Sequence, residues 1–250
     1  MGGGDRDAQR EQFLAIVSHE MRTPLTSIIS FSELIRGEAA GLSPDGLRYL
    51  GIIERNADRL LKLVSDLLML GRIESGALPL DLGPVDVPRL AGDAVVAATP
   101  LAAKQDITVH LDAREGPLLQ GDHRRLLQVL DNLISNAVKF SYPGGLVRVT
   151  ARYHAARGPE GGAWKVGVID TGIGIPPGEA ERLFGRFERG TNARAAGLPG
   201  SGLGLSIVKV ITDMHGGHIR VHSVLGEGTR FSVFLPVAGP GEQPAGGLYE

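Results

Sequence analysis

Residues 13–25 read FLAIVSHEMRTPL, a helical pattern that contains one proline, Pro24. A proline inside a helix loses a backbone hydrogen bond and clashes with the carbonyl four residues earlier, at a cost of ~3 kcal/mol. That carbonyl belongs to Glu20, which directly follows His19. Because strained backbone beside an ionisable pair is frequent at functional sites, we select His19 and Glu20 as candidate catalytic residues.

Apolar side chains recur every seven residues around this stretch and again after residue 43. The repeat predicts helices at 8–37 and 44–73, joined by a short loop in which Ser43 is an N-cap signal. Such helices form an antiparallel hairpin, and one hairpin cannot bury both apolar rows of each helix. We therefore expect a dimeric four-helix bundle, with His19 directed away from the seam. The rows are Leu14, Met21, Ile28 and Ile35 with Val17 and Phe31, and Leu50, Ala57 and Val64 with Ile53, Leu60 and Leu67.

The proline- and glycine-rich segment 75–89 is predicted to link a helical domain at 8–74 to a second domain at 90–237. In the second domain, alternation predicts strands at 107–111, 147–153, 164–169, 218–224 and 230–235. Helical periodicity predicts helices at 88–104, 124–140 and 203–215. Residues 225–229 have the composition of a hairpin turn, so we expect a mixed sheet and an α+β fold overall. Residues 238–250 are predicted to be a disordered tail.

The composition excludes several classes of protein. The chain has 250 residues, a formal net charge of −2 and no cysteine. The charge gives no electrostatic basis for binding nucleic acid, and disulfides and thiolate metal sites are excluded. No apolar run approaches the ~18 residues of a membrane span, so we expect a cytoplasmic localisation for this piece. The leading Met-Gly-Gly-Gly resembles an added leader, so we expect the natural protein to extend further, and a membrane anchor there stays open.

Asn132 and Asn136 lie one helical turn apart on the predicted helix 124–140, and Lys139 is three residues further on. An amide oxygen is a suitable hard ligand for a magnesium ion that keeps most of its water and phosphate ligands. A lysine supplies a point charge to phosphates. Two asparagines on a helix are more often surface or capping residues, so this pattern alone leaves both interpretations open.

Two glycine-rich segments follow predicted elements. Asp170-Thr-Gly-Ile-Gly174 comes after a strand, where a carboxylate can accept a hydrogen bond from an exocyclic amine such as that of adenine; a plain turn is the alternative. Gly200-Ser-Gly-Leu-Gly-Leu205 precedes a helix, whose N-terminus is an anion site; a flexible loop is the alternative. The second segment does not match G-x-G-x-x-G, because Leu205 stands at the third glycine, and the chain has no P-loop.

Taken together and in this order, these motifs resemble those of sensor histidine kinases. Residues 13–25 resemble the phosphoacceptor box, and the second domain resembles the ATP-binding domain shared with gyrase, heat-shock ATPase and mismatch-repair proteins. The matching segments are 122–140 for the N box, 170–174 for G1, 184–189 for F, 200–205 for G2 and 226–229 for G3. The resemblance covers roughly residues 10–236 and implies a dimeric four-helix bundle followed by an α/β-sandwich (Bergerat-type) domain.

The resemblance also implies a reaction and its participants. ATP would phosphorylate His19, Glu20 would accept a proton or hold the imidazole tautomer, and the phosphoryl group would pass to an aspartate on a response regulator receiver domain in trans. A sensory domain would lie upstream. The implied ligands are ATP and Mg²⁺, with Asn136 as the metal ligand supported by Asn132, and Lys139 on the phosphates. The implied nucleotide contacts are Asp170 and Thr229 with adenine, Gly172 and Gly174 beside the base, and Gly200, Gly202, Leu203 and Gly204 in the lid over the triphosphate.

Two further interpretations stay open at this stage. Thr23, three residues after Glu20, resembles the position that orients water for dephosphorylation of the regulator, although an ordinary helical threonine fits too. A dimeric scaffold that binds ATP without turnover is the non-enzymatic alternative. The lid at 191–199 leaves open which of Arg186, Arg189 and Arg194 contacts phosphate.

Overall fold

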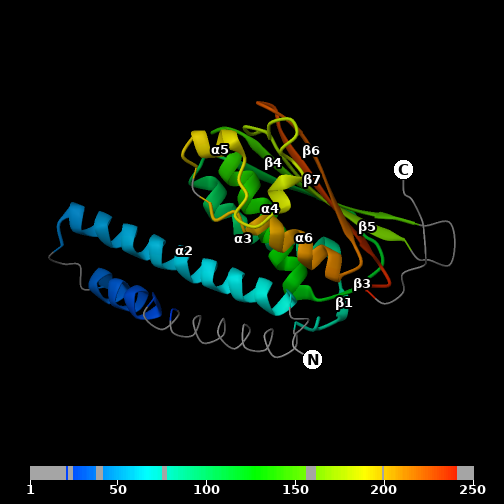
Figure 1. Cartoon of the computed structure of the whole chain (residues 1–250), viewed down its shortest axis with the longest axis horizontal. Helices are drawn as coiled ribbons and strands as arrows, with labels where there is room; N and C mark the ends of the chain where they lie inside the picture. Colours follow the sequence, from blue (N-terminus) through cyan, green and yellow to red (C-terminus); the bar gives the residue numbers. More distant parts are fainter. Residues whose placement is uncertain are drawn as a thin grey trace, which may run out of the picture. The chain divides into compact units, whose positions relative to one another are not determined.

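The computed structural model describes residues 21, 25–37, 42–74, 78–155, 162–198 and 200–240. The chain divides into two compact units, Met1–Pro79 and Leu80–Glu250. The first is a helical hairpin, and the second is an α/β unit with a mixed sheet (Figure 1). This confirms the predicted fold class. Within the described residues, no helix is long and apolar enough to cross a membrane.

The helical unit consists of a helix at 25–37 and α2, Pro44–Glu74. Ser43 caps α2, as predicted, because its Oγ accepts the Gly46 N–H at 3.1 Å. The two helices are joined by an ion pair in which Arg36 donates two hydrogen bonds to the Glu54 carboxylate. Leu50, Ala57 and Val64 form a buried row along α2. Ile53, Leu60 and Leu67, the second predicted row, are 40–44% exposed.

The second unit contains a five-stranded sheet with strand order β2-β4-β5-β7-β6. β2 pairs with β4 in parallel and the other pairs are antiparallel, so the sheet is mixed as predicted. The strands are β2 Thr108–Ala113, β4 Leu146–His154, β5 Ala163–Asp170, β6 His218–Val224 and β7 Gly228–Pro236. The main helices are α3 Val87–Ala103, α4 His123–Phe140 and α6 Gly204–Met214. All eight lie within two residues of their predicted bounds.

The three helices pack on one side of the sheet (Figure 1). The strand residues that face them are almost entirely buried, with Val147, Val149 and Trp164 at 0% exposure. The indole N–H of Trp164 donates to the Pro117 carbonyl at 2.9 Å, which satisfies its polar atom inside the core. The opposite side of the sheet carries none of these helices.

Four short elements were not predicted: β1 Gly83–Val85, β3 Leu119–Gly121, the 3₁₀ turn Arg182–Phe184 and α5 Thr191–Ala195. Elements of three to five residues are too short for either periodicity to show. The segment 75–89, expected to be a linker, contains β1 and the beginning of α3. Pro84 lies in a two-stranded sheet and Pro88 in the first turn of α3, two positions that tolerate proline.

Candidate functional site

Asn132 and Asn136 are placed by α4, whose N-terminus is fixed by Asp122. The Asp122 carboxylate accepts the Arg125 N–H at 3.0 Å and so caps the helix. Asn132 is 4% exposed. A Cβ built on Gly204 would lie 3.5 Å from Oδ1 of Asn132 and 3.9 Å from Nδ2 of Asn136. The first residue of α6 therefore lies against both amides.

Asp170 is the last residue of β5 and is only 7% exposed. Its Oδ1 accepts the Gly172 N–H at 3.0 Å and the Thr229 N–H at 3.2 Å. Both donors use Oδ1, so Oδ2 is the oxygen left to accept a hydrogen bond from a ligand. Burial raises the pKa of Asp170 to about 6, against the lowering effect of the two N–H groups. At neutral pH the carboxylate is thus ionised although burial disfavours its charged form. Such a perturbed pKa is frequent at functional sites.

The glycines around Asp170 are required by close backbone contacts. A Cβ on Gly172 would lie 2.1 Å from the Phe140 carbonyl oxygen, and one on Gly174 would lie 2.1 Å from that of Val224. Gly174 also has φ of +64°, a conformation that other residues rarely adopt. These contacts join the end of α4, the G1 segment and the hairpin between β6 and β7. Thr229 completes the group, because its hydroxyl bonds that of Ser223 at 2.8 Å.

The G2 segment brings its glycines against Lys139 and against the segment before α5. A Cβ on Gly200 would lie 2.7 Å from Nζ of Lys139, and one on Gly202 would lie 2.5 Å from the carbonyl carbon of Phe187. Gly202 has φ of +74° and Phe187 has φ of +61°, which strains a side-chain-bearing residue. Leu203 is fully buried, so its side chain lies in the core. No side chain caps α6, which leaves its first N–H groups available for an anion.

Residues 187–198, here called the lid segment, are held by two side chains that sequence analysis missed. Glu179 accepts both the N–H and the hydroxyl of Thr191, at 2.9 and 2.6 Å, and these bonds lower its pKa. Asn192 donates to the Gly174 carbonyl at 2.9 Å, which ties α5 to the G1 segment. Neither residue belongs to a periodic pattern or a glycine motif, so no local signal could have identified them.

The lid arginines have partners within the same segment. Arg189 donates to the Leu198 carbonyl. Arg194 lies 3.9 Å from the Glu188 carboxylate. Both would have to leave these partners to reach a phosphate.

His215, which the sequence analysis left out of the site, has a structural role in the second unit. It is 1% exposed, its Nδ1 donates to the Ile211 carbonyl at 2.8 Å, and its Nε2 accepts the Asp122 N–H at 3.0 Å. These partners require the neutral imidazole, and burial lowers its pKa. The ring thereby joins the C-terminus of α6 to the N-terminus of α4.

The structure thus brings Asp170, Gly172, Gly174 and Thr229 together at one end of β5 and β7. It brings Asn132 and Asn136 together with Gly204, and Lys139 together with Gly200. His19, Glu20 and Thr23 lie outside the described residues, and so does Pro24. Their proposed roles rest on the sequence.

Two family models match the chain. Residues 9–76 match the His Kinase A (phospho-acceptor) domain, and residues 121–239 match the histidine kinase-, DNA gyrase B-, and HSP90-like ATPase. The first match lies in the first compact unit and the second match lies in the second.

Curated relatives are similar over most of this chain. It is 36% identical over 240 residues to the circadian input-output histidine kinase CikA of Synechococcus elongatus, a match that covers 92% of this chain and 30% of that protein. It is 40% identical over 238 residues to the histidine protein kinase DivJ of Caulobacter vibrioides, covering 92% and 38%. The chain therefore spans about a third of the length of each of these two relatives.

Solved structures agree in fold. Full-length ShkA, crystallised in complex with AMPPNP, has a TM-score of 0.74 at 32% identity over 91% of this chain and 46% of that one. The mycobacterial sensor histidine kinase MprB has a TM-score of 0.52 at 31% identity, covering 63% of this chain and 99% of that one. With both domains matched in this order, the chain belongs to the sensor histidine kinases.

Proposed function

We propose that this chain is the catalytic core that transfers the γ-phosphoryl group of ATP to His19 and then to an aspartate of a separate response regulator. The observation that carries the nucleotide half of the proposal is the Asp170 site. A buried carboxylate whose Oδ1 already accepts two N–H groups presents Oδ2 to a ligand, and the adenine amino group is a matching donor. Gly172 and Gly174 let the backbone of Phe140 and of Val224 pack closely against the segment that follows it.

The phosphates would lie between α4 and the N-terminus of α6. The uncapped helix end offers N–H groups and the positive end of its dipole, and Lys139 adds a charge beside Gly200. The amide oxygens of Asn132 and Asn136 fit Mg²⁺, because they are hard neutral ligands on one face of α4 against Gly204. Asn136 would hold the ion, with Asn132 in support. Bound there, Mg²⁺ would neutralise charge on the β- and γ-phosphates.

The residues that take part in the phosphoryl transfer itself lie in the phosphoacceptor segment. Nε2 of His19 attacks the γ-phosphorus while the bond to the β,γ-bridging oxygen breaks, so an N–P bond forms and ADP leaves with the electron pair. Glu20 accepts the imidazole proton or holds the ring in the tautomer with a free Nε2. In the second step, a carboxylate oxygen of the regulator attacks the phosphorus and the N–P bond breaks.

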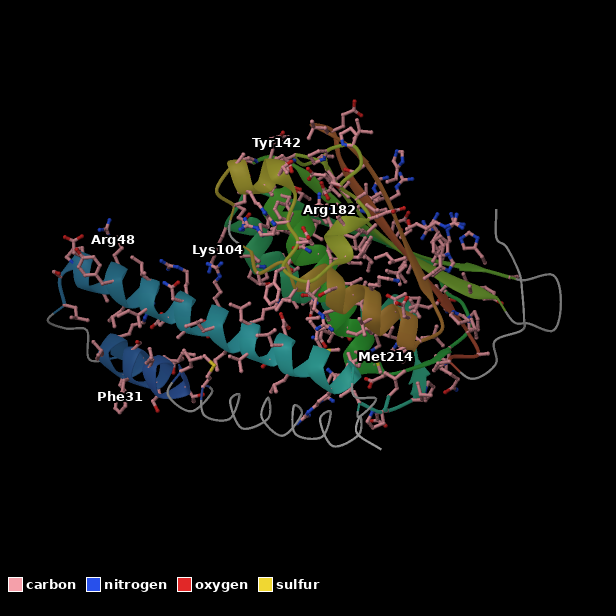
Figure 2. The ribbon with its side chains drawn as sticks, in the orientation of Figure 1. Phe31, Arg48, Lys104, Tyr142, Arg182 and Met214 are labelled. Carbon is pink, nitrogen blue, oxygen red and sulfur yellow. The ribbon has the colours of Figure 1, made fainter. Side chains whose placement is uncertain are left out.

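Dimerisation is supported by the apolar residues that the hairpin leaves exposed. Ile53, Leu60 and Leu67 repeat every seven residues along α2 at 40–44% exposure. On the preceding helix, Phe31 is 63% exposed and lies on the side away from α2 (Figure 2). A second hairpin would cover this row and Phe31 and would complete a four-helix bundle. In sedimentation, we expect the wild-type chain to be a dimer and Leu60→Lys to be a monomer. The control Arg59→Lys should remain a dimer.

The proposed kinase reaction is tested by incubating the chain with γ-labelled ATP and Mg²⁺. Acid-labile label that is lost in His19→Ala supports it. Label that persists in His19→Ala contradicts the assignment of His19. No label on a folded dimer that binds ATP would favour a phosphatase or a non-catalytic scaffold.

The same chain is proposed to dephosphorylate its regulator through Thr23. Thr23→Ala should abolish loss of phosphate from the regulator and leave His19 labelling intact. If both activities fall together, Thr23 does not have this separate role.

A further inference from the structure

Within the described residues of the second unit, α3, α4 and α6 pack on one side of the five-stranded sheet, and we call the other side the open face. Alternation along each strand separates the two sides, because successive side chains point in opposite directions. Burial identifies the helix side, as on β4, where Val147, Val149 and Ala151 are buried and Arg148 is exposed. The open face consists of Thr108, His110 and Asp112 on β2; Leu146, Arg148, Thr150, Arg152 and His154 on β4; Ala163, Lys165, Gly167 and Ile169 on β5; Arg230, Ser232 and Phe234 on β7; and His218, Arg220, His222 and Val224 on β6.

This face is basic although the chain is not. Five of its residues are arginine or lysine, namely Arg148, Arg152, Lys165, Arg220 and Arg230, and four more are histidines. Asp112 is the only carboxylate among these strand residues, and it is already paired with Arg152. Figure 2 shows nitrogen-ended side chains gathered along the side of the sheet away from α4 and α6. The formal net charge of the whole chain is −2, so this face differs in sign from the chain as a whole.

The strand register brings basic side chains directly opposite one another. Arg152 lies opposite Lys165, and on the other edge His222 lies opposite Arg230. Arg148 and Arg230 flank Ile169 from the two neighbouring strands. Like charges in opposed positions destabilise a sheet, and a neutral polar residue would avoid the cost. An anionic partner would reduce the repulsion among such basic residues.

The surroundings of Phe234 indicate which kind of anionic partner fits the open face. His218 stacks on its ring at 4.5 Å and 6° between planes, with Lys165 and Arg220 at 5.5 and 5.6 Å from its centre. Phe234 is the one aromatic ring of the Phe, Tyr or Trp type among the open-face residues, so the face offers neither a free stacking platform for bases nor a protruding anchor for a bilayer. Arginine predominates over lysine, and its planar fork matches carboxylates, as in the Arg152–Asp112 pair.

We propose that the open face is a docking surface for an acidic protein, with carboxylates presented at helical spacing. Side chains two residues apart on a strand are ~7 Å apart, and those on adjacent strands are ~4.8 Å apart. Glu or Asp three and four residues apart on a helix have a similar spacing of ~5–6 Å. The face measures roughly 19 by 24 Å from these spacings, or ~450 Å². This is below the ~800 Å² per partner of a stable interface, so the complex is transient and depends on salt.

The test uses the whole chain and a fluorescent helical peptide with glutamates four residues apart. The variant is Arg148→Glu with Arg230→Glu, two exposed residues of the face that flank Ile169 from the strands on either side of β5. The matched control is Lys104→Glu with Arg124→Glu, which makes the same change of charge at two exposed positions, the C-cap of α3 and the first turn of α4. Binding is measured by anisotropy at about 50 mM and about 200 mM salt. AMPPNP binding and thermal unfolding verify that each variant is folded.

We expect the face variant to weaken peptide binding at least about tenfold and to lose most of its salt dependence, with the control within about twofold. Equal losses in both variants would overturn the proposal, because they would show attraction to charge anywhere on the chain. A wild-type chain that does not bind the peptide at low salt would also overturn the proposal. Tighter binding to duplex DNA, or to vesicles containing phosphatidylserine, than to the peptide would also overturn it and identify the other class of anion.

Discussion

Replacing Asp170 with asparagine should weaken ATP binding and stabilise the free protein at the same time. Asparagine keeps the volume and an Oδ1 acceptor for the Gly172 and Thr229 N–H groups. It replaces Oδ2 with a donor that would face the adenine amino group, so a hydrogen bond to a charged acceptor is lost. Such a bond contributes ~1.5–3 kcal/mol, which corresponds to a rise in Kd of roughly tenfold to a hundredfold.

The stability gain follows from the raised pKa. Asp170 has a pKa of about 6 in the folded protein against 3.8 as a model carboxyl, so the folded state binds the proton more tightly than the unfolded state. The free energy of unfolding therefore falls as pH rises from 3.8 to about 6 and stays lower above. At 1.36 kcal/mol per pKa unit, the ionised buried carboxylate costs about 3 kcal/mol at neutral pH. Asparagine removes most of that cost.

The two effects are measured on the whole chain. Calorimetric titration with AMPPNP gives the affinity, and circular dichroism gives the melting temperature without nucleotide. Wild-type affinity should decrease as pH falls through about 6, because Asp170 becomes protonated, and the affinity of Asp170→Asn should not change over that range. Asp213→Asn, which breaks an exposed pair with Lys209, should change neither quantity appreciably.

Two results would refute this reasoning. If Asp170→Asn binds AMPPNP within about twofold of the wild-type affinity, the carboxylate does not hydrogen-bond the adenine base. A lower melting temperature together with weaker binding would mean that the loss comes from damage to the fold.

Three further substitutions address the lid segment and the core. Gly202→Ala should weaken ATP binding about tenfold, because its Cβ would lie 2.5 Å from the Phe187 carbonyl carbon at φ of +74° and would displace the lid segment; unchanged calorimetric affinity would contradict this. Asn192→Ala should speed nucleotide release about fivefold in stopped flow, since it removes a hydrogen bond of ~1 kcal/mol to the Gly174 carbonyl; an unchanged release rate would exclude the tether. His215→Leu should cost ~2–3 kcal/mol in urea unfolding at neutral pH. Because burial lowers the pKa of His215, wild type should also lose stability as pH falls below about 6.5, and the leucine variant should lack that component.

Each of these has a matched control in the chain. Gly197 also has a positive φ, of +63°, but its Cβ would meet nothing within 4 Å, so Gly197→Ala separates backbone strain from the clash with Phe187. Asn192→Asp keeps the oxygen that accepts the Ala193 N–H but replaces the donor to the Gly174 carbonyl with a charged oxygen, so it should also speed nucleotide release. His222→Leu changes an exposed histidine on β6 and should leave the free energy of unfolding nearly unchanged.

Much of the fold could be predicted because the signals are local. The seven-residue repeat of Leu50, Ala57 and Val64 identifies a buried row on one helix, and the structure buries it. Alternation predicted all five strands of the large sheet, and the segment 225–229 predicted the hairpin that makes the sheet mixed. Strands of three residues, β1 and β3, carry no such repeat. They exist because they pair with each other across a long stretch of chain, as at Gly83 opposite Gly121 and Pro84 opposite Gln120.

The sequence by itself determined the family, the order of the motifs and the candidate residues on them, because each motif lies within one short segment. Only the tertiary structure decided what those residues meet. Asp170 has its raised pKa because the core on the helix side of β5 buries it, while the Thr229 N–H, 59 residues away, acts against that rise. The Asn192 tether and the basic open face were likewise invisible until packing and strand register placed distant residues together. Side chains follow the period of their own backbone, but charge, burial and close contact depend on neighbours that no local pattern specifies.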